Sequence, residues 1–222
     1  MQFETRRLIL RPWQPSLDAR HAMDIYGDEA VVKWIDAQGK DTSIRQVQMR
    51  LQRYLDNTKN IITGSWAVEQ KDIGRVIGHV LLMHLPDLKK IKPSKPLHTD
   101  LGGEPEWEPE LNQQPNESLS IQYPDGYQPD YIEIGWHFRP ASWGFGYATE
   151  AARCIVQYAF EQLNLPLLLA VTDPENKRSI AVIEKLGMRY DGLTARYYGG
   201  KLLALYILNA NNCNIKGHSQ SK

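Results

Sequence analysis

Residues 132–152, IEIGWHFRPASWGFGYATEAA, constrain the fold of this chain more than any other segment. The apolar positions at its start predict a strand, a turn follows at Pro140, and small and apolar residues after Gly146 predict a helix. Glycine lets backbone N–H groups approach an anion closely, and the start of a helix adds partial positive charge in the same place. The segment therefore indicates a sheet with a helix packed on it, and a diphosphate group is the ligand that suits it best.

Gly144 and Gly146 also fit a plainer interpretation, in which they only make a tight turn between strand and helix. Two other phosphate-binding motifs do not match. A P-loop needs Gly-Lys-Ser or Gly-Lys-Thr, which is absent from the sequence. A dinucleotide fingerprint needs a third small residue where Thr149 stands, and an acidic ribose partner near Pro166 and Leu167.

The rest of the chain alternates between strand and helix patterns. It predicts helices at residues 16–26 (with Ser16 as the N-cap), 42–55, 148–163 and 180–186, and strands at residues 6–12, 64–69, 76–85, 131–138, 167–171, 189–197 and 202–208. Gly199 and Gly200 favour a hairpin between the last two strands. This order predicts one α/β domain, residues 1–222, with a mixed sheet and helices on its faces.

Residues 86–129 interrupt this pattern. These 44 residues contain 8 of the 13 prolines, which deny the backbone donors that a helix or a sheet interior needs. We expect an insertion loop within the domain. Four lysines lie at 89–95 and five glutamates at 104–117. The acidic half could favour a cationic substrate, although a solvated loop whose charges only keep it soluble is the plainer interpretation.

Composition excludes several partners. Lys plus Arg and Asp plus Glu both number 26, so no net charge favours nucleic acid. The two cysteines, Cys154 and Cys213, are too few for a disulfide framework and favour a reducing compartment, the cytoplasm. The six histidines lack metal-ligand spacing, so no metal is expected. No stretch has the character of a signal peptide or a membrane span, so no membrane contact is expected.

The segment at 132–152 resembles the acetyl-coenzyme A binding signature of the GNAT N-acetyltransferase superfamily. Three further segments agree: ETRRLILR at 4–11 resembles the first strand of the branch that includes the ribosomal-protein N-terminal acetyltransferases (RimJ/RimL type), VIGHV at 76–80 its third strand, and NKRS through EKLGM at 176–188 its fourth helix. The resemblance implies a central, twisted, mostly antiparallel sheet of about seven strands with helices on both faces.

The resemblance also implies that acetyl-coenzyme A is the co-substrate. The residues that would hold it lie on the strand, the glycine loop and two helix starts: Trp136, His137, Phe138, Trp143, Gly144, Phe145, Gly146, Tyr147, Ala148 and Asn176. Two positions depart from the family pattern. Ala141 stands where Gln or Arg is usual, and Ile183 stands where many relatives carry a tyrosine as the acid for the departing thiolate.

Acetyl transfer to an amine needs a group that accepts the amine proton. Glu133, on the strand expected beside the thioester, is the candidate general base. Alternatively it is a structural carboxylate paired with Arg139 or Arg11. Backbone N–H groups near Gly135 and Trp136 could stabilise the oxyanion.

Ser179 is the remaining candidate donor to the thiolate, because relatives in the same branch carry a serine at this point of the helix. Its alternative role is to support a helix turn that Asn176 or Asp173 caps.

The predicted activity is therefore transfer of acetyl from acetyl-coenzyme A to a primary amine, possible acceptors being a protein N-terminal α-amine or a small molecule such as a polyamine, an aminoglycoside or an amino-acid derivative. A module that binds acyl-coenzyme A without turnover is the alternative from another class. Relatives occur as monomers and homodimers, and the sequence leaves this choice open.

Overall fold

The structure, a computed structural model, describes residues 1–35, 39–56, 62–85 and 131–212. The predicted insertion at 86–129 lies outside these ranges, so its role and the single-domain boundary stay predictions. The strands are β1 (Phe3–Glu4), β2 (Leu8–Arg11), β3 (Gly64–Gln70), β4 (Arg75–His84), β5 (Ile132–Phe138), β6 (Leu167–Thr172), β7 (Arg189–Thr194) and β8 (Leu203–Asn209). The α-helices are α1 (Pro15–Tyr26), α2 (Glu29–Val32), α3 (Ile44–Asp56), α4 (Tyr147–Glu161) and α5 (Lys177–Lys185).

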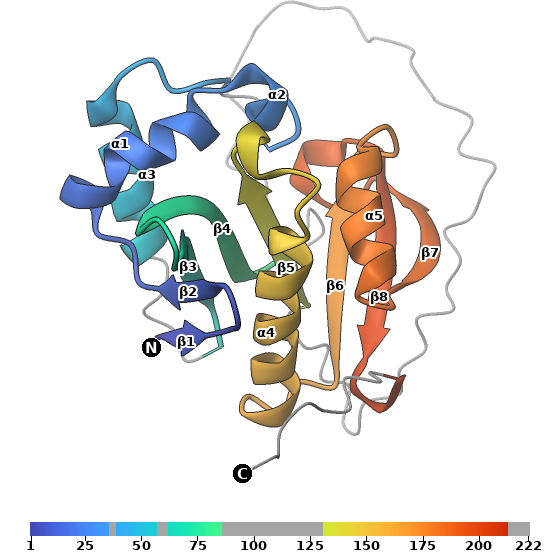
Figure 1. Cartoon of the computed structure of the whole chain (residues 1–222). Helices are drawn as coiled ribbons and strands as arrows, with labels where there is room; N and C mark the ends of the chain where they lie inside the picture. Colours follow the sequence, from blue (N-terminus) through green and yellow to red (C-terminus); the bar gives the residue numbers. More distant parts are fainter. Residues whose placement is uncertain (36–38, 57–61, 86–130, 213–222) are drawn as a thin grey trace, which may run out of the picture.

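One twisted sheet contains all eight described strands, in the order β1-β2-β3-β4-β5-β6-β8-β7 (Figure 1). Neighbouring strands are antiparallel except β5 and β6, which are parallel. The parallel pair is connected through α4, which packs on the sheet as a crossover helix. The mixed, mostly antiparallel α/β fold expected from the sequence is therefore confirmed.

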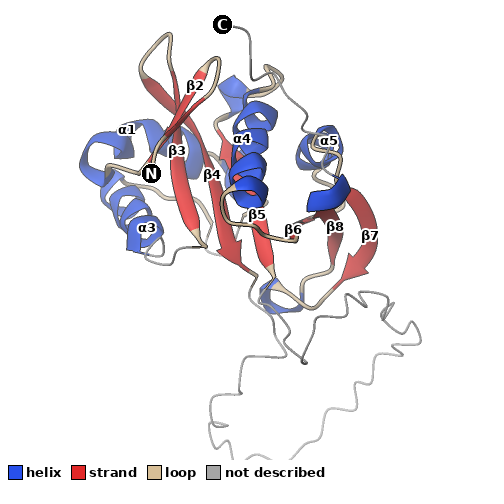
Figure 2. Ribbon diagram, turned by 90° about the horizontal axis from the view of Figure 1, so that it is seen from below, coloured by secondary structure: helices blue, strands red, loops and turns tan. Residues whose placement is uncertain are grey.

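Helices cover both faces of the sheet (Figure 2). The period of two along β5 places Ile132, Ile134 and Phe138 in the core beneath α4 and α5, and it turns Glu133 toward the opposite face. On that opposite face α1 and α3 pack together against β3 and β4. A smaller apolar cluster around Leu169 and Tyr197 continues the same face beyond β5.

Three details differ from the sequence predictions. The sheet has eight strands, because the two-residue β1 adds an edge to the predicted seven. Ser16 is not the N-cap of α1: the helix begins one residue earlier at Pro15, whose fixed φ suits a first turn, so Gln14 takes the cap position. The short helix α2 was not predicted, although Asp28 caps it by accepting from the N–H of Ala30.

Candidate active site

The strands β5 and β6 pair at one register position, Glu133 opposite Leu169. On its other edge β5 pairs with β4 along its whole length, from Ile132 opposite His84 to Phe138 opposite Gly78. The parallel ladder therefore stops just after Glu133, and the backbone edge of β5 beyond this point pairs with no described strand. The two strands separate toward their C-terminal ends (Figure 1).

Glu133 lies at this break with its side chain 6% exposed. Its Oε2 accepts a hydrogen bond from the hydroxyl of Tyr198, and the backbone N–H of Val171 also donates to the carboxylate. Burial raises the pKa of Glu133 to about 7, although both hydrogen bonds favour the charged form. A carboxyl with such a pKa changes protonation near neutral pH, which a general base requires.

The alternative arginine partners of Glu133 are engaged elsewhere. Arg11 forms ion pairs with Asp18 and Glu69, both at 2.8 Å. Arg139 donates to the hydroxyl of Ser142 at 2.9 Å. Glu133 is therefore a buried carboxylate held by neutral donors.

Tyr198 is a site residue that sequence reasoning missed. It lies between β7 and β8, directly before the glycine pair that predicted a turn. A tyrosine beside a glycine turn was the available signal, but nothing in the sequence indicates that this turn folds back onto β5.

The glycine loop connects β5 to α4 as predicted. Gly144 has a φ of 84° and Gly146 a φ of 78°, the left-handed region in which a side chain is strained. Gly146 is the N-cap of α4, and no side chain caps the helix. The N–H groups at residues 147–149 therefore keep their capacity to bind an anion. A Cβ at Gly144 would meet nothing within 4 Å, so this part of the loop is open.

Arg7, near the N-terminus, contacts the glycine loop and the first turn of α4. Its Nε forms an ion pair with Glu150 at 2.7 Å, and its Nη1 donates to the carbonyl of Phe145 at 3.0 Å. The hydroxyl of Thr5 donates to Glu150 at 2.6 Å, and the guanidinium lies 4.4 Å from the ring centre of Tyr147. The turn between β1 and β2 thereby fixes the first turn of α4.

Trp143 links the loop to its neighbours. Its indole N–H donates to the carbonyl of Phe138 at 2.8 Å, and the guanidinium of Arg178 on α5 lies 4.5 Å from its ring centre. Phe138 itself is buried in the core, whereas Phe145 is 61% exposed. Trp143 and Phe138 therefore shape the loop, and Phe145 is available at its surface.

The start of α5 carries the last two predicted site residues. Asn176 is the N-cap, and its Oδ1 accepts from the N–H of Ser179 at 3.2 Å, which confirms that Asn176 caps this helix. The Ser179 side chain is half-buried. Ile183, at the position where relatives carry tyrosine, is fully buried in the core.

A buried polar network lies on the α1 and α3 face of the sheet. The Nδ1 of His79 is 2.8 Å from the hydroxyl of Tyr26, and its Nε2 is 2.7 Å from the hydroxyl of Ser65. Burial, and then the neighbouring His137, hold the pKa of His79 well below its usual value. His137 faces this network from β5, and its Nδ1 is 3.5 Å from the Tyr26 hydroxyl. The His137 side chain thus lies on the same sheet face as Glu133.

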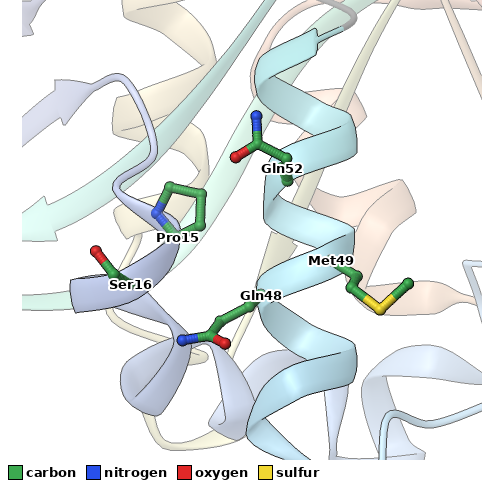
Figure 3. A pocket seen from close by; sticks show the side chains of 5 residues that line it. All are labelled: Pro15, Ser16, Gln48, Met49 and Gln52. Carbon is green, nitrogen blue, oxygen red and sulfur yellow. The ribbon is translucent and has the colours of Figure 1, made fainter.

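A surface pocket lies away from these residues, between α1 and α3 (Figure 3). Its lining side chains are Pro15, Ser16, Gln48, Met49 and Gln52. None of them is charged, and none comes from β5, β6 or the glycine loop. The pocket is therefore separate from Glu133 and the glycine loop.

No group of three or more His, Cys, Asp or Glu side chains in the described ranges is arranged to hold a metal ion. None of the helices in the described part of the chain has the length and apolar character to cross a membrane.

Comparison with known proteins finds relatives that match part of this chain. The Bacillus subtilis protein named uncharacterized N-acetyltransferase YnaD is 47% identical over 60 residues, 27% of this chain and 35% of that protein. FsC-acetyl coenzyme A-N(2)-transacetylase of Aspergillus fumigatus is 39% identical over 71 residues, 32% of this chain and 30% of that protein. The chain thus matches about a third of the length of these relatives.

The fold is shared with a solved structure, Mycobacterium smegmatis RimJ in complex with CoA-disulfide. The TM-score is 0.65 at 17% identity, over 93% of this chain and 84% of that chain. The family described as acetyltransferase (GNAT) domain matches residues 7–94 and 113–189, which contain β2, Glu133, the glycine loop and α5. The chain belongs to the GNAT acetyltransferase family.

Proposed function

We propose that this chain is an N-acetyltransferase that moves acetyl directly from acetyl-coenzyme A to a primary amine. The observation that carries the proposal is the position of Glu133. This buried carboxylate, with a pKa of about 7, lies where β5 and β6 separate. Its strand leads into the glycine loop and then into α4, whose first turn has no side-chain cap. When bound, acetyl-coenzyme A supplies an activated thioester acyl group.

The residues of the glycine loop fit the diphosphate of this co-substrate. Backbone donors at 147–149 lie at the uncapped start of α4, and Gly144 leaves the approach open. Binding through backbone groups explains why the departure at Ala141 need not abolish the site. Along β5, the backbone at Gly135 and Trp136 lies beyond the parallel ladder with β6 and would offer further donors and acceptors to the pantetheine arm, and Asn176 would contact the same arm.

Glu133 would remove the proton of the acceptor amine. At pH 7 a lysine amine costs about 4.6 kcal/mol to deprotonate, whereas an α-amine of pKa about 8 costs about 1.4 kcal/mol. The pKa of Glu133, about 7, is close to the pKa of an α-amine and far below the pKa of lysine. This match favours an α-amine, such as a protein N-terminus, as the acceptor.

The remaining charges of the reaction have candidate partners. Backbone N–H groups near Gly135 and Trp136 would stabilise the oxyanion, because β5 pairs with no described strand there. Ser179 would donate to the departing thiolate, since this half-buried residue lies at the start of α5, where Asn176 binds its backbone N–H. Ile183 cannot take this role, because it has no donor and is buried.

A small-molecule amine is the second candidate acceptor. A relative matched over part of its length is named as an N(2)-transacetylase that uses acetyl coenzyme A. A small amine whose pKa lies near that of an α-amine would suit Glu133 equally well. The pKa of Glu133 therefore favours an acceptor amine with a pKa near 8, and the assay below distinguishes a protein N-terminus from a small molecule.

The test is release of free thiol from acetyl-coenzyme A with three kinds of amine: peptides with a free N-terminus and blocked lysines, peptides with a blocked N-terminus and free lysines, and polyamines with aminoglycosides. We expect turnover with α-amine peptides that is much slower in Glu133→Gln. Binding of acetyl-coenzyme A without turnover on any amine would instead support a module that only binds the acyl carrier.

A further inference from the structure

Tyr198 reaches Glu133 from a strained turn. Its backbone φ is 49°, in the left-handed region, and Gly199 and Gly200 follow with φ of 73° and 85°. A tyrosine in this conformation costs about 1 kcal/mol or more unless other contacts offset it. From this turn the Tyr198 hydroxyl donates a hydrogen bond to Glu133. The same hydroxyl lies 3.7 Å from the sulfur of Met83.

The two partners differ in their access to solvent. Glu133 is 6% exposed, whereas Tyr198 is 38% exposed. The second donor to the carboxylate, the N–H of Val171, is a backbone group that cannot pass on a proton. Tyr198 therefore connects the buried carboxylate to a residue that reaches the surface.

We propose that Tyr198 is a positioning residue that fixes the Glu133 carboxylate and relays its proton from the buried site to solvent. The role rests on the proposed function, because it needs Glu133 to act as the base. In the resting site the phenol donates to the carboxylate and holds its Oε2 toward the turn.

The relay moves one proton from the amine to water and needs no other reactant. The amine N–H bond breaks and an O–H bond forms on Glu133. The phenol then rotates its own O–H toward water, and the Glu133 proton moves to the phenol oxygen as the phenol proton passes to water. Glu133 returns to carboxylate, Tyr198 returns to phenol, and one proton has left the site.

The neighbours of the pair keep the phenol neutral. Burial is the largest cause that raises the pKa of Tyr198, and the charge of Glu133 is the second. The phenol of Tyr54 on α3 also raises it. Met83, on β4, is uncharged, and from β6 the group facing the carboxylate is the N–H of Val171. The phenol of Tyr198 therefore stays protonated throughout the physiological pH range.

The first test is a titration that needs no activity. In full-length protein with carboxyl-labelled glutamate, the resonance that disappears in Glu133→Gln reports Glu133, and its midpoint is expected at about pH 7. Tyr198→Phe removes a donor to the carboxylate, so the midpoint should rise by about one unit. A midpoint that does not move would overturn the positioning role.

The second test is turnover of Tyr198→Phe with the amine that wild type acetylates best in the panel above. We expect at least about a tenfold lower rate, a pH–rate midpoint moved upward, and partial recovery on adding imidazole as a proton carrier. The control is Tyr190→Phe on exposed β7, whose ring packs on Tyr206 and not on Glu133. It should behave as wild type.

The outcomes separate the two proposals. A slow Tyr198→Phe whose midpoint and imidazole response match wild type would overturn the relay, because a merely structural residue behaves in this way. Full activity of Tyr198→Phe beside a slow Glu133→Gln would overturn the Tyr198 role and leave the base intact. If wild type turns over no amine, the proposed function fails, and the titration still decides whether Tyr198 positions Glu133.

Discussion

Arg7 and Glu150 form an ion pair across 143 residues of chain, and this pair fixes the glycine loop to the first hairpin. Glu150 accepts from the Arg7 backbone as well as from its side chain. Burial opposes ionisation, but hydrogen bonds from Thr5 and Arg7 outweigh it and lower the pKa of Glu150. The stabilisation is therefore present above the unfolded pKa and is lost as the pH falls through the lower folded value.

Glu150→Gln should loosen the loop more than it destabilises the fold. The pair is partly exposed, so the loss of unfolding free energy should be at most about 1 kcal/mol. The affinity for acetyl-coenzyme A should fall about threefold to tenfold, because the loop donors lose their fixed position. Calorimetric titration measures this change. Glu161→Gln, in the last turn of the same helix, is the control, and equal affinities in the two variants would contradict the account.

Gly146→Val should weaken binding of acetyl-coenzyme A strongly. A Cβ at a φ of 78° strains the backbone by about 1–2 kcal/mol and narrows the approach to the helix start. Gly74 is also left-handed, with a φ of 56°, but lies in the turn between β3 and β4. Gly74→Val should show a similar loss of stability with unchanged affinity. Unaltered binding by Gly146→Val would mean that the diphosphate lies elsewhere.

Glu133→Gln should become relatively more stable than wild type as the pH rises. The folded pKa is about 7 against an ordinary value of 4.5, so the unfolded chain loses this proton first and wild-type stability falls between these two values. Above pH 7 the loss of unfolding free energy in the wild type stays constant at about 3 kcal/mol. Urea unfolding of both proteins at pH 5 and pH 8 measures the difference. A gap that does not widen would show that Glu133 ionises normally.

The same substitution should lower the rate without changing the affinity for acetyl-coenzyme A. Wild-type activity should rise with pH through about 7, as the Glu133 carboxyl loses its proton. Glu133→Gln should lose this rise together with about a hundredfold or more of the rate. Equal rates of the two proteins across the pH range would refute the assignment of the base.

His79→Gln tests the buried network next to the site. The pKa of His79 is lowered by burial, so its neutral form contributes stability above the unfolded value of about 6.5 that is lost as the pH falls. Gln keeps a donor and an acceptor but does not titrate, so the variant should be destabilised by about 1–2 kcal/mol at pH 7. The stability difference should shrink toward pH 5. A constant difference would mean that the pKa of His79 is the same in the folded and the unfolded chain.

Local patterns predicted the elements well. The alternation at 132–138 and the glycine pair at 144 and 146 specified β5, the turn and α4 nearly to the residue, because each depends on nearby chain. The position of Glu133 on the face opposite Ile134 follows from the same period of two. Ser16 was wrong as a cap because Pro15 is the better first residue of a helix.

Contacts between distant segments could not be predicted in this way. The Tyr198 bond to Glu133 and the Arg7 pair with Glu150 depend on how the turns fold back over the sheet. The donation from Val171 depends on where the parallel ladder between β5 and β6 stops. None of these contacts is encoded by spacing, so the sequence predicted the strand and the face on which Glu133 lies but not the groups that contact it.

The central claim is that this fold binds acetyl-coenzyme A at the glycine loop. Its most direct test is the melting temperature of the full-length protein with and without acetyl-coenzyme A at about one hundred times the dissociation constant. Mass action predicts about 2.7 kcal/mol of stabilisation, a rise of about 5–11 °C for a protein of this size, which Gly146→Val should lack. A folded wild-type protein whose melting temperature does not change would contradict the claim.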